Sequence, residues 1–354
     1  MTSTLSPSST TLQFVEAMAA RLDAAGVSFG HGTTNAFDEA AWLVLWQLGH
    51  PLHALDEVAD DAVTPEAAAQ VEALVQRRID SRRPAAYLTG EAWLQGVPFH
   101  VDERVIVPRS FIAELLADAE LGAELDAWLS PDTRRVLDLC TGNGSLAVLS
   151  AMAFPDIEVD AADISPDALS VARLNVDRHE LAGRIRLVES DGLGVPALAG
   201  PYDLILCNPP YVNAASMAAL PPEYLAEPQI ALAGGRDGMD FVRQLLKDAP
   251  ARMSPDAVLV LEIGNEREHF EAAFPQLEAI WLETSAGHDQ VLLLTRAALL
   301  GSCDRQGSHR RQTPTSGAIR TRLRQSQPIP VLICRFGHPR GSDTAPRPAA
   351  QDMA

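Results

Sequence analysis

Between residues 134 and 264, short apolar runs alternate with longer helical stretches, and this alternation most limits what the chain can fold into. Runs that are apolar on both faces predict five strands, at residues 134–140, 157–164, 185–190, 202–208 and 257–264. With helical crossovers between them, such strands form a parallel sheet that is covered on both sides. Two later runs, AIWLETS and QVLLLTR, lie too close together for a crossover and predict an antiparallel hairpin. The expected fold class is therefore α/β, with a mostly parallel seven-stranded sheet that ends in an antiparallel hairpin.

The flanking sequence divides into regions that differ in apolar patterning and composition. Residues 1–83 predict a small helical domain, in which Asn35 and Thr64 are N-caps and Pro65 begins a helix. Residues 84–110 alternate around glycines and predict a β-hairpin linker. The α/β domain is expected over 111–300, and it starts with one helix over 111–129. Residues 301–354 are polar and rich in Arg, Ser, Gly and Pro, so a disordered basic tail is predicted there.

Charge limits the partners that the chain can bind. The net charge of the 354 residues is −19, but residues 301–354 carry nine arginines and three aspartates, so residues 1–300 carry about −25. Such an acidic body repels a phosphate backbone, and free nucleic acid is not expected as the direct substrate. The tail is either a ribosome- or RNA-touching arm or an extension without function. We expect a cytoplasmic protein, because no secretory signal and no apolar run of 18 residues is visible. The four cysteines form no CxxC pair, so reduced thiols and no metal site are predicted.

The stretch VLDLCTGNGSLAV, residues 136–148, reads as a strand, a glycine turn and a helix start. Gly142 and Gly144 allow backbone to approach a ligand closely, and the free N–H groups of a helix start face it. A tight turn alone can also need such glycines. A dinucleotide site usually has GxGxxG, whereas CTGNG is short for a pyrophosphate and fits the adenosyl group of S-adenosylmethionine better.

Acidic residues at three successive strand ends strengthen this interpretation. Asp163 lies 19 residues after Gly144, where a carboxylate can accept hydrogen bonds from both ribose hydroxyls. Asp191 ends the third run and can receive an adenine amino group, and Asp138 ends the first. Asp163 also precedes Ser165 and Pro166, so an ordinary role at a helix start stays open.

The stretch LCNPPYV, residues 206–212, ends the fourth strand, because proline cannot donate to a sheet ladder. The Asn208 side chain and the Pro209 carbonyl are two acceptors that can hold both hydrogens of one planar –NH2 group. Pro209 and Pro210 keep the backbone stiff, and Tyr211 can pack on the flat face of an amide or a base. Acceptors on these hydrogens stabilise the positive charge that develops when the nitrogen takes a methyl group. The alternative is a strand that two prolines merely terminate.

NPPY and DLCTGNG together resemble methyltransferases that act on planar amino groups, either N6-adenine methyltransferases or protein N5-glutamine methyltransferases of the HemK/PrmB type. The resemblance to the second group covers roughly residues 80–296 and includes EPQIALAGGRDGMDFVRQLL and LVLEIGNE. Within that group, Cys140, VPRS at 107–110 and LPPEYLAEP at 220–228 are similar to the PrmB branch, whereas the release-factor branch has glycine and proline at Cys140 and Ser110. Phe111 and the basic tail depart from the pattern.

The resemblance implies a class I, Rossmann-like methyltransferase domain that uses S-adenosyl-L-methionine. It also implies N5-methylation of a glutamine in large-subunit ribosomal protein three, with the helical domain recognising that protein. Release-factor glutamines, adenine in nucleic acid and a non-catalytic role in ribosome assembly are the alternatives. The implied cofactor-binding residues are Asp138, Cys140, Thr141, Gly142, Asn143, Gly144, Asp163, Asp191 and Asn208. The implied substrate-binding residues are Asn208, Pro209, Pro210, Tyr211 and Arg109, of which Asn208, Pro209 and Tyr211 are catalytic.

The matched segments contain two conspicuous polar residues, Arg109 and Glu227, and of these the resemblance assigns a role only to Arg109. Arg109 is expected either to help close the active site or to form an ion pair on the surface.

Overall fold

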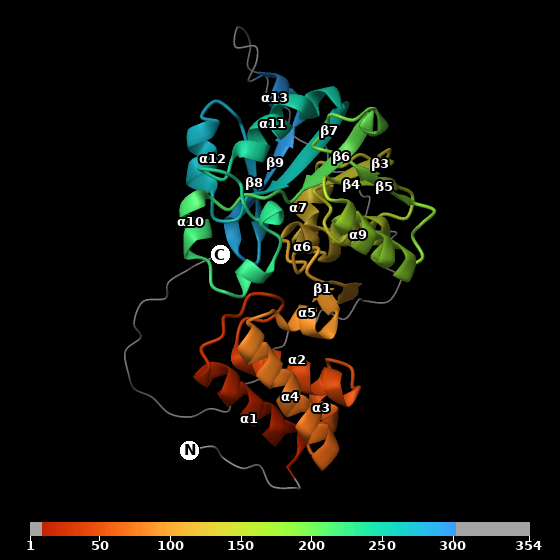
Figure 1. The fold of residues 1–354 in the computed structure, drawn as a ribbon. Helices are drawn as coiled ribbons and strands as arrows, with labels where there is room; N and C mark the ends of the chain where they lie inside the picture. Colours follow the sequence, from red (N-terminus) through yellow and green to blue (C-terminus); the bar gives the residue numbers. More distant parts are fainter. Residues whose placement is uncertain (1–8, 302–354) are drawn as a thin grey trace.

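The computed structural model describes residues 9–301, and within them a helical region lies beside a sheet that is covered by helices (Figure 1). The strands are β1 (Glu91–Leu94), β2 (Val97–His100), β3 (Arg135–Leu139), β4 (Glu158–Asp163), β5 (Ile185–Glu189), β6 (Tyr202–Cys207), β7 (Met253–Glu262), β8 (Ile280–Thr284) and β9 (Gly287–Thr295). The helices before β3 are α1 (Thr11–Ala24), α2 (Ala36–Leu48), α3 (Leu55–Val58), α4 (Pro65–Ser81), α5 (Ala85–Thr89), α6 (Ile112–Ala117) and α7 (Gly122–Asp126).

The later helices connect the strands of the large sheet. The α-helices are α8 (Ser145–Ala153), α9 (Pro166–Arg178), α10 (Ala214–Ala219), α11 (Asp240–Asp248), α12 (Arg267–Ala273) and α13 (Arg296–Gly301). The 3-10 helices are η1 (Pro196–Leu198), η2 (Tyr224–Ala226), η3 (Gln229–Ala231) and η4 (Ala249–Ala251). No helix within residues 9–301 has both the length and the apolar character that a membrane crossing requires.

The large sheet confirms the predicted architecture. Its strand order is β5-β4-β3-β6-β7-β9-β8, and only β9 runs antiparallel to its neighbours. The order reverses between β3 and β6, and ligands of open parallel sheets bind at this point beyond the carboxyl ends of the strands. Leu139 lies opposite Cys207 in the register. The glycine loop and the NPPY stretch therefore leave the sheet side by side.

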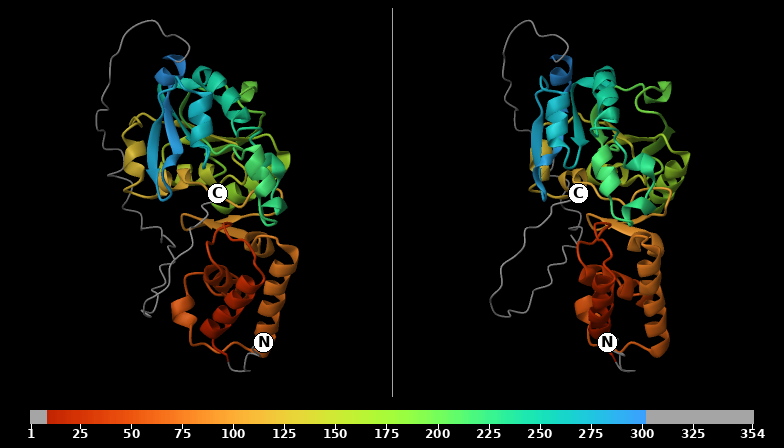
Figure 2. Two further views of the ribbon diagram at one scale, coloured as in Figure 1. Left: turned by 90° about the vertical axis from the view of Figure 1, so that its left-hand side faces the viewer. Right: turned by 60° about the vertical axis from the view of Figure 1, so that its left-hand side comes forward.

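Both faces of this sheet are apolar because successive strand residues alternate between two cores. On β3, Val136 packs with α6 and α8, whereas Leu137 packs with α11 on the opposite face. The two views of Figure 2 show helices on both sides of the sheet. This double burial explains why the strands read as continuous apolar runs.

The helical region follows its predicted caps. The Asn35 side chain accepts a hydrogen bond from Asp38 N, and that of Thr64 accepts one from Ala67 N with Pro65 in the first turn. The β1–β2 hairpin is present in the predicted linker, but α5 precedes it and ends at Gly90 in a left-handed conformation. The core of the helical region also contains Val105 and Val107 from the extended stretch after the hairpin.

The prediction of one helix over 111–129 was wrong. The stretch forms two short helices, α6 and α7, that are separated at Asp118. Asp118 has an extended backbone, and its carboxylate accepts hydrogen bonds from the N–H groups of Glu120 and Leu121. A side chain that caps the following turn in this way ends the preceding helix. The predicted basic tail after residue 301 lies outside the described residues.

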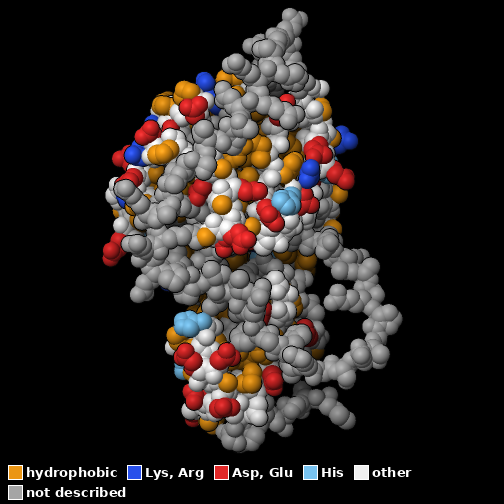
Figure 3. Space-filling model, turned by 180° about the vertical axis from the view of Figure 1, so that it is seen from behind, with side chains coloured by type: hydrophobic (Ala, Val, Ile, Leu, Met, Phe, Trp, Pro, Cys, Tyr) orange, Lys and Arg blue, Asp and Glu red, His pale blue; other side chains and the backbone are white. Residues whose placement is uncertain are grey.

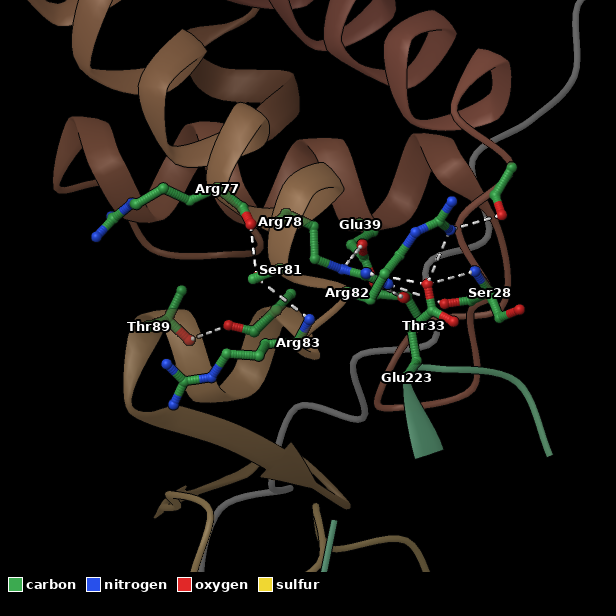
Figure 4. Close-up of polar contacts among 12 residues, drawn as sticks. Ser28, Thr33, Glu39, Arg77, Arg78, Ser81, Arg82, Arg83, Thr89 and Glu223 are labelled. Atoms are coloured by element: carbon green, nitrogen blue, oxygen red, sulfur yellow. Dashed lines mark hydrogen bonds and ion pairs between the residues drawn. The ribbon is translucent and has the colours of Figure 1, made fainter. Parts of the chain in front are cut away.

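The segment 220–228, between NPPY and α11, enters the helical region through buried charges (Figure 4). The Glu223 carboxylate accepts hydrogen bonds from Ser28 N at 3.1 Å, Arg78 Nη1 at 3.3 Å and Arg82 Nη1 at 3.2 Å. Arg78 is fully buried and also binds Glu39, with 2.8 Å between Nε and Oε1. Because buried charges need partners, this network fixes the segment against α2 and α4.

We expect Arg78→Ala to lower the free energy of unfolding by about 3–5 kcal/mol, because Glu39 and Glu223 lose a buried partner. Denaturant unfolding measures this loss. Arg243→Ala is the control, since its pairs with Asp237 and Asp240 are exposed and worth less than about 1 kcal/mol. Equal losses in the two variants would contradict the importance of the buried network.

Candidate active site

A cavity of about 170 Å³ lies beyond the carboxyl ends of β3, β4, β5 and β6, at the reversal of strand order. Its walls combine apolar side chains with a few polar groups, as in most small-molecule sites. From the strand ends and the elements after them, it is lined by Leu139, Cys140, Gly142, Asp163, Ile164, Ser165, Ala168, Ser190, Asp191, Gly192, Asn208 and Pro210. From the hairpin linker and the segment before and within α11, it is lined by Arg104, Val105, Ile106, Pro228, Ile230, Ala231 and Phe241.

The structure brings six of the predicted site residues to this cavity: Cys140, Gly142, Asp163, Asp191, Asn208 and Pro210. The other predicted residues do not line it: Arg109, Asp138, Thr141, Asn143, Gly144, Pro209 and Tyr211.

Asp163 holds the glycine loop and starts α9 at the same time. Its Oδ2 accepts from Gly142 N at 2.9 Å, and its Oδ1 accepts from Ser165 N at 2.9 Å. Burial raises the pKa of Asp163, against these backbone hydrogen bonds. Each carboxylate oxygen has two acceptor sites, so both oxygens can still accept from a ligand hydroxyl. The two sequence interpretations, a helix start and a ligand acceptor, are thus compatible.

Left-handed backbone shapes the glycine loop. Gly142 and Gly144 have φ of +55° and +82°, and Cys140 also has a positive φ of +62°. A Cβ atom at Gly144 would lie 3.2 Å from the Cβ atom of Ala172 in α9, so glycine permits close packing there. The loop glycines therefore serve conformation and packing as well as access to the cavity.

Beneath the loop, Asp138 is fully buried and binds Thr141 Oγ1 at 2.5 Å and Ala147 N at 3.0 Å. Burial raises its pKa to about 7, against these two hydrogen bonds. Among residues 9–301, Asp138 Oδ1 and Asn143 Nδ2 find no hydrogen-bond partner although both atoms are buried. Buried polar groups without partners are costly.

Cys140 and Cys207 are free thiols on the neighbouring strand ends. A hydrogen bond with Cys207, together with burial, raises the pKa of Cys140 well above its usual value. A protonated thiol is a poor nucleophile, so Cys140 acts as a small wall residue of the cavity.

Tyr211 sits in a cage of three glycines. A Cβ atom at Gly234 would lie 2.7 Å from Tyr211 Cα, one at Gly264 would lie 2.6 Å from Cε2, and one at Gly238 would overlap the Tyr211 carbonyl oxygen. Val212 continues this packing, since its N–H donates to Leu232 O at 2.9 Å. The backbone after the two prolines is therefore held on several sides.

Arg109 is 29% exposed but forms a bidentate ion pair with the buried carboxylate of Glu227, and not the surface pair considered from the sequence. Its Nη1 and Nη2 lie 2.7 and 2.6 Å from the two carboxylate oxygens of Glu227, and its guanidinium lies over the Tyr224 ring. Burial opposes ionisation of Glu227, but the charge and hydrogen bonds of Arg109 lower its pKa to about 2. His31, from the helical region, lies 3.4 Å from the same carboxylate. The pair thus joins the linker, the segment 220–228 and the helical region.

Two further polar residues of this region were not predicted. Glu262 ends β7, is 2% exposed and accepts from Ser110 Oγ at 2.5 Å. Asn175 in α9 is fully buried and bridges His100 of β2 to the carbonyl of Asn143 in the glycine loop. The only sequence signal for them is a polar residue within an apolar pattern, in LVLEIG and in SVARLNV.

The sheet, the glycine loop and the cavity at the strand reversal define a class I methyltransferase domain. Residues 121–261 match the family model described as "Methyltransferase small domain".

Relatives define the family more narrowly. The chain is 55% identical to the ribosomal protein uL3 glutamine methyltransferase of Bordetella pertussis, over 79% of this chain and 92% of that protein. It is 49% identical to the protein of the same name from Burkholderia pseudomallei, over 84% and 98%. It is 44% identical to that of Bradyrhizobium diazoefficiens, over 82% and 92%. The chain belongs to the family of ribosomal protein uL3 glutamine methyltransferases, and it is a protein glutamine methyltransferase.

We expect Gly264→Ala to lower methyltransferase activity at least about tenfold, because the new methyl group would displace the Tyr211 ring from its place beside the cavity. Steady-state kinetics measures the effect. Gly26→Ala is the matched control, since Gly26 has a similar φ of +59° and open space around its Cβ position. If both variants lose the same activity, backbone strain and not the ring position is responsible.

We expect Asp138→Asn to become more stable relative to the unaltered chain as pH rises from about 4 to about 7. The folded-state pKa of Asp138 is raised, so ionisation of this buried carboxyl destabilises the native state over this interval, by at most about 1.4 kcal/mol per pH unit. Above the raised pKa the difference stays constant. Unfolding of both proteins in denaturant at several pH values measures it, and a difference that does not change with pH would contradict the raised pKa.

Proposed function

We propose that the chain transfers the methyl group of S-adenosylmethionine to the side-chain nitrogen of a glutamine in ribosomal protein uL3. The observation that carries the proposal is the place of Asn208, which follows β6 and lines the cavity next to the glycine loop. The family relationship supports the substrate. From a ribosomal protein substrate we infer that the reaction takes place in the cytoplasm.

The cavity suits an adenosyl group with a polar, charged end. Asp163 would accept from the ribose hydroxyls, and the exposed Asp191 at the other side would accept from the adenine amino group. Apolar walls from Ile164, Ile230 and Phe241 would cover the adenine ring. The methionine part would lie along the loop from Cys140 to Gly144, of which Cys140 and Gly142 line the cavity. When bound, the cofactor supplies an electrophilic methyl group on a sulfonium centre.

The chain's own contribution is the orientation of the substrate amide. Asn208 Oδ1 and the Pro209 carbonyl would each accept one hydrogen of the glutamine –NH2 group. Tyr211 would pack against the flat amide and keep it from rotating. Since the prolines stiffen this backbone, little conformational entropy is lost when the substrate binds.

These acceptors also favour the reaction itself. An amide nitrogen is a weak nucleophile, and positive charge grows on it as the new C–N bond forms. Acceptors that face its hydrogens stabilise this charge more than they stabilise the ground state. No separate general base is needed, because the alkylated nitrogen is strongly acidic and gives its proton to these acceptors or to water. Positioning then supplies much of the rate.

The helical region, residues 1–83, would bind the substrate protein around its glutamine, with 84–110 as linker and 111–300 as catalytic domain. Acidic side chains lie on both parts of the face in Figure 3. Residues 1–300 carry a net charge of about −25, which favours a basic protein partner and disfavours bare nucleic acid.

We expect Asn208→Ala to lower kcat about 100-fold or more, with little change in cofactor affinity, because one acceptor on the reacting nitrogen is lost. Asp163→Ala is expected to do the opposite, raising KM for S-adenosylmethionine more than it changes kcat. Transfer of labelled methyl groups to purified uL3, followed by mass spectrometry of the modified peptide, measures both.

The same assay tests the substrate. Label on release factors but not on uL3 would move the activity to the release-factor branch, and label on protein-free DNA or RNA would contradict a protein substrate. Weaker cofactor binding in Asn208→Ala with an unchanged kcat would make Asn208 a cofactor-binding residue only and would contradict its role as a substrate acceptor.

A further inference from the structure

The side-chain amide of Asn208 can lie in two orientations, and only one of them offers its oxygen to a substrate –NH2 group. Asn208 Nδ2 lies 3.4 Å from the carbonyl oxygen of Arg109. A carbonyl can only accept, so this contact requires the amide nitrogen to face Arg109 and turns Oδ1 away from it. At 3.4 Å the hydrogen bond is weak, and its strength depends on where the Arg109 carbonyl is held.

The residues after Arg109 are fixed by Glu262. Ser110 Oγ donates to Glu262 Oε2 at 2.5 Å, and Ile112 N donates to the same oxygen at 3.4 Å. Glu262 is 2% exposed, so water competes little for this carboxyl group. Ile112 N also donates to Ser110 Oγ at 3.2 Å, so the hydroxyl joins Glu262 to the backbone at the start of α6.

Glu262 is a rigid reference point because it belongs to the sheet. Leu261 of β7 lies opposite Cys207 of β6, so Glu262 and Asn208 each follow a paired residue at the same edge. The stretch 109–112 contacts both strand ends, Asn208 through a backbone carbonyl and Glu262 through a hydroxyl. On its other side, the guanidinium of Arg109 is held by Glu227.

We propose that Ser110 and Glu262 are positioning residues for methyl transfer: they hold the Arg109 carbonyl where it fixes the Asn208 amide, with Oδ1 toward the substrate nitrogen. This inference rests on the proposed role of Asn208. Neither residue touches the reacting atoms, and neither lines the cavity.

The first test compares Ser110→Ala with the conservative Ser110→Thr in steady-state methylation of uL3. We expect Ser110→Ala to lower kcat about 10- to 100-fold, because small misplacements of a reacting group have effects of this size. The dissociation constant of S-adenosylmethionine, measured by calorimetry, should stay within about twofold. Ser110→Thr keeps the hydroxyl and should recover most of the loss, and Glu262→Gln should resemble Ser110→Ala.

A double variant tests whether the effect passes through Asn208. In an Asn208→Ala background, Ser110→Ala should cause little further loss, because there is no side-chain amide left to orient. An equal loss in both backgrounds would overturn the proposal, and so would a kcat of Ser110→Ala equal to that of the unaltered chain.

Asp160→Asn is the control for general damage to the fold. Asp160 in β4 is 7% exposed and accepts from Tyr202 Oη at 2.6 Å and Arg186 Nε at 2.7 Å. Its replacement should lower stability and leave kcat at 25 °C within about twofold. If Asp160→Asn lowers kcat as much as Glu262→Gln does, the loss in Glu262→Gln would reflect general destabilisation, and the proposal would be contradicted.

A measurement without substrate separates this inference from the proposed function. In asparagine-labelled protein, the side-chain NH2 signal of Asn208, assigned by its loss in Asn208→Ala, should shift and broaden in Ser110→Ala and in Glu262→Gln. If the unaltered chain does not methylate uL3, the proposed function fails, whereas an unchanged Asn208 signal in both variants overturns the positioning proposal alone.

Discussion

The buried carboxylates of Glu223 and Glu227 tie the two parts of this chain together. A carboxylate can lose its water only where positive charge and hydrogen-bond donors replace it. Here Arg78 and Arg82 meet Glu223, and Arg109 meets Glu227. Because these partners come from the helical region and the linker, the segment 220–228 can adopt its position only when all three parts are in place.

This constraint reaches the cavity along the chain. Pro228 and Ile230 follow the buried carboxylates in sequence and line the cavity. The segment that contains them leaves the catalytic domain after Val212 and returns at Gly234, whose N–H donates to the Val212 carbonyl. The helical region, which we propose binds the substrate protein, is therefore coupled mechanically to the residues around the reacting amide. In the mechanism that we propose, which needs no general base, such rigidity would supply much of the rate.

Local rules predicted the parts of the fold that depend on neighbours in sequence. The caps at Asn35 and Thr64 and the apolar runs of the sheet could be read directly, since capping and strand patterning act over a few residues. The helix expected over 111–129 failed at Asp118, whose side chain caps a turn that the apolar pattern hides. Asp138 was grouped with Asp163 and Asp191 as a strand-end acid, yet it is buried and does not line the cavity, whereas the other two do. The position of an acidic residue at a strand end does not show whether the following loop covers its side chain or leaves it facing the cavity.

The sequence by itself determined the α/β class, the alternation of strands with helices in the sheet domain, and the two stretches, DLCTGNG and NPPY, that form the candidate site. It could do so because periodicity, glycine and proline act locally on the backbone. Only the tertiary structure decided which polar and charged side chains bind one another: Arg109 with Glu227, Arg78 with Glu223, and Ser110 with Glu262. These pairs join residues more than a hundred positions apart, and no local pattern specifies which buried charges will meet. The environment of Asn208 therefore depends on the assembled fold. Its place at the end of a strand follows from the sequence LCNPPYV alone, because the two prolines end the strand.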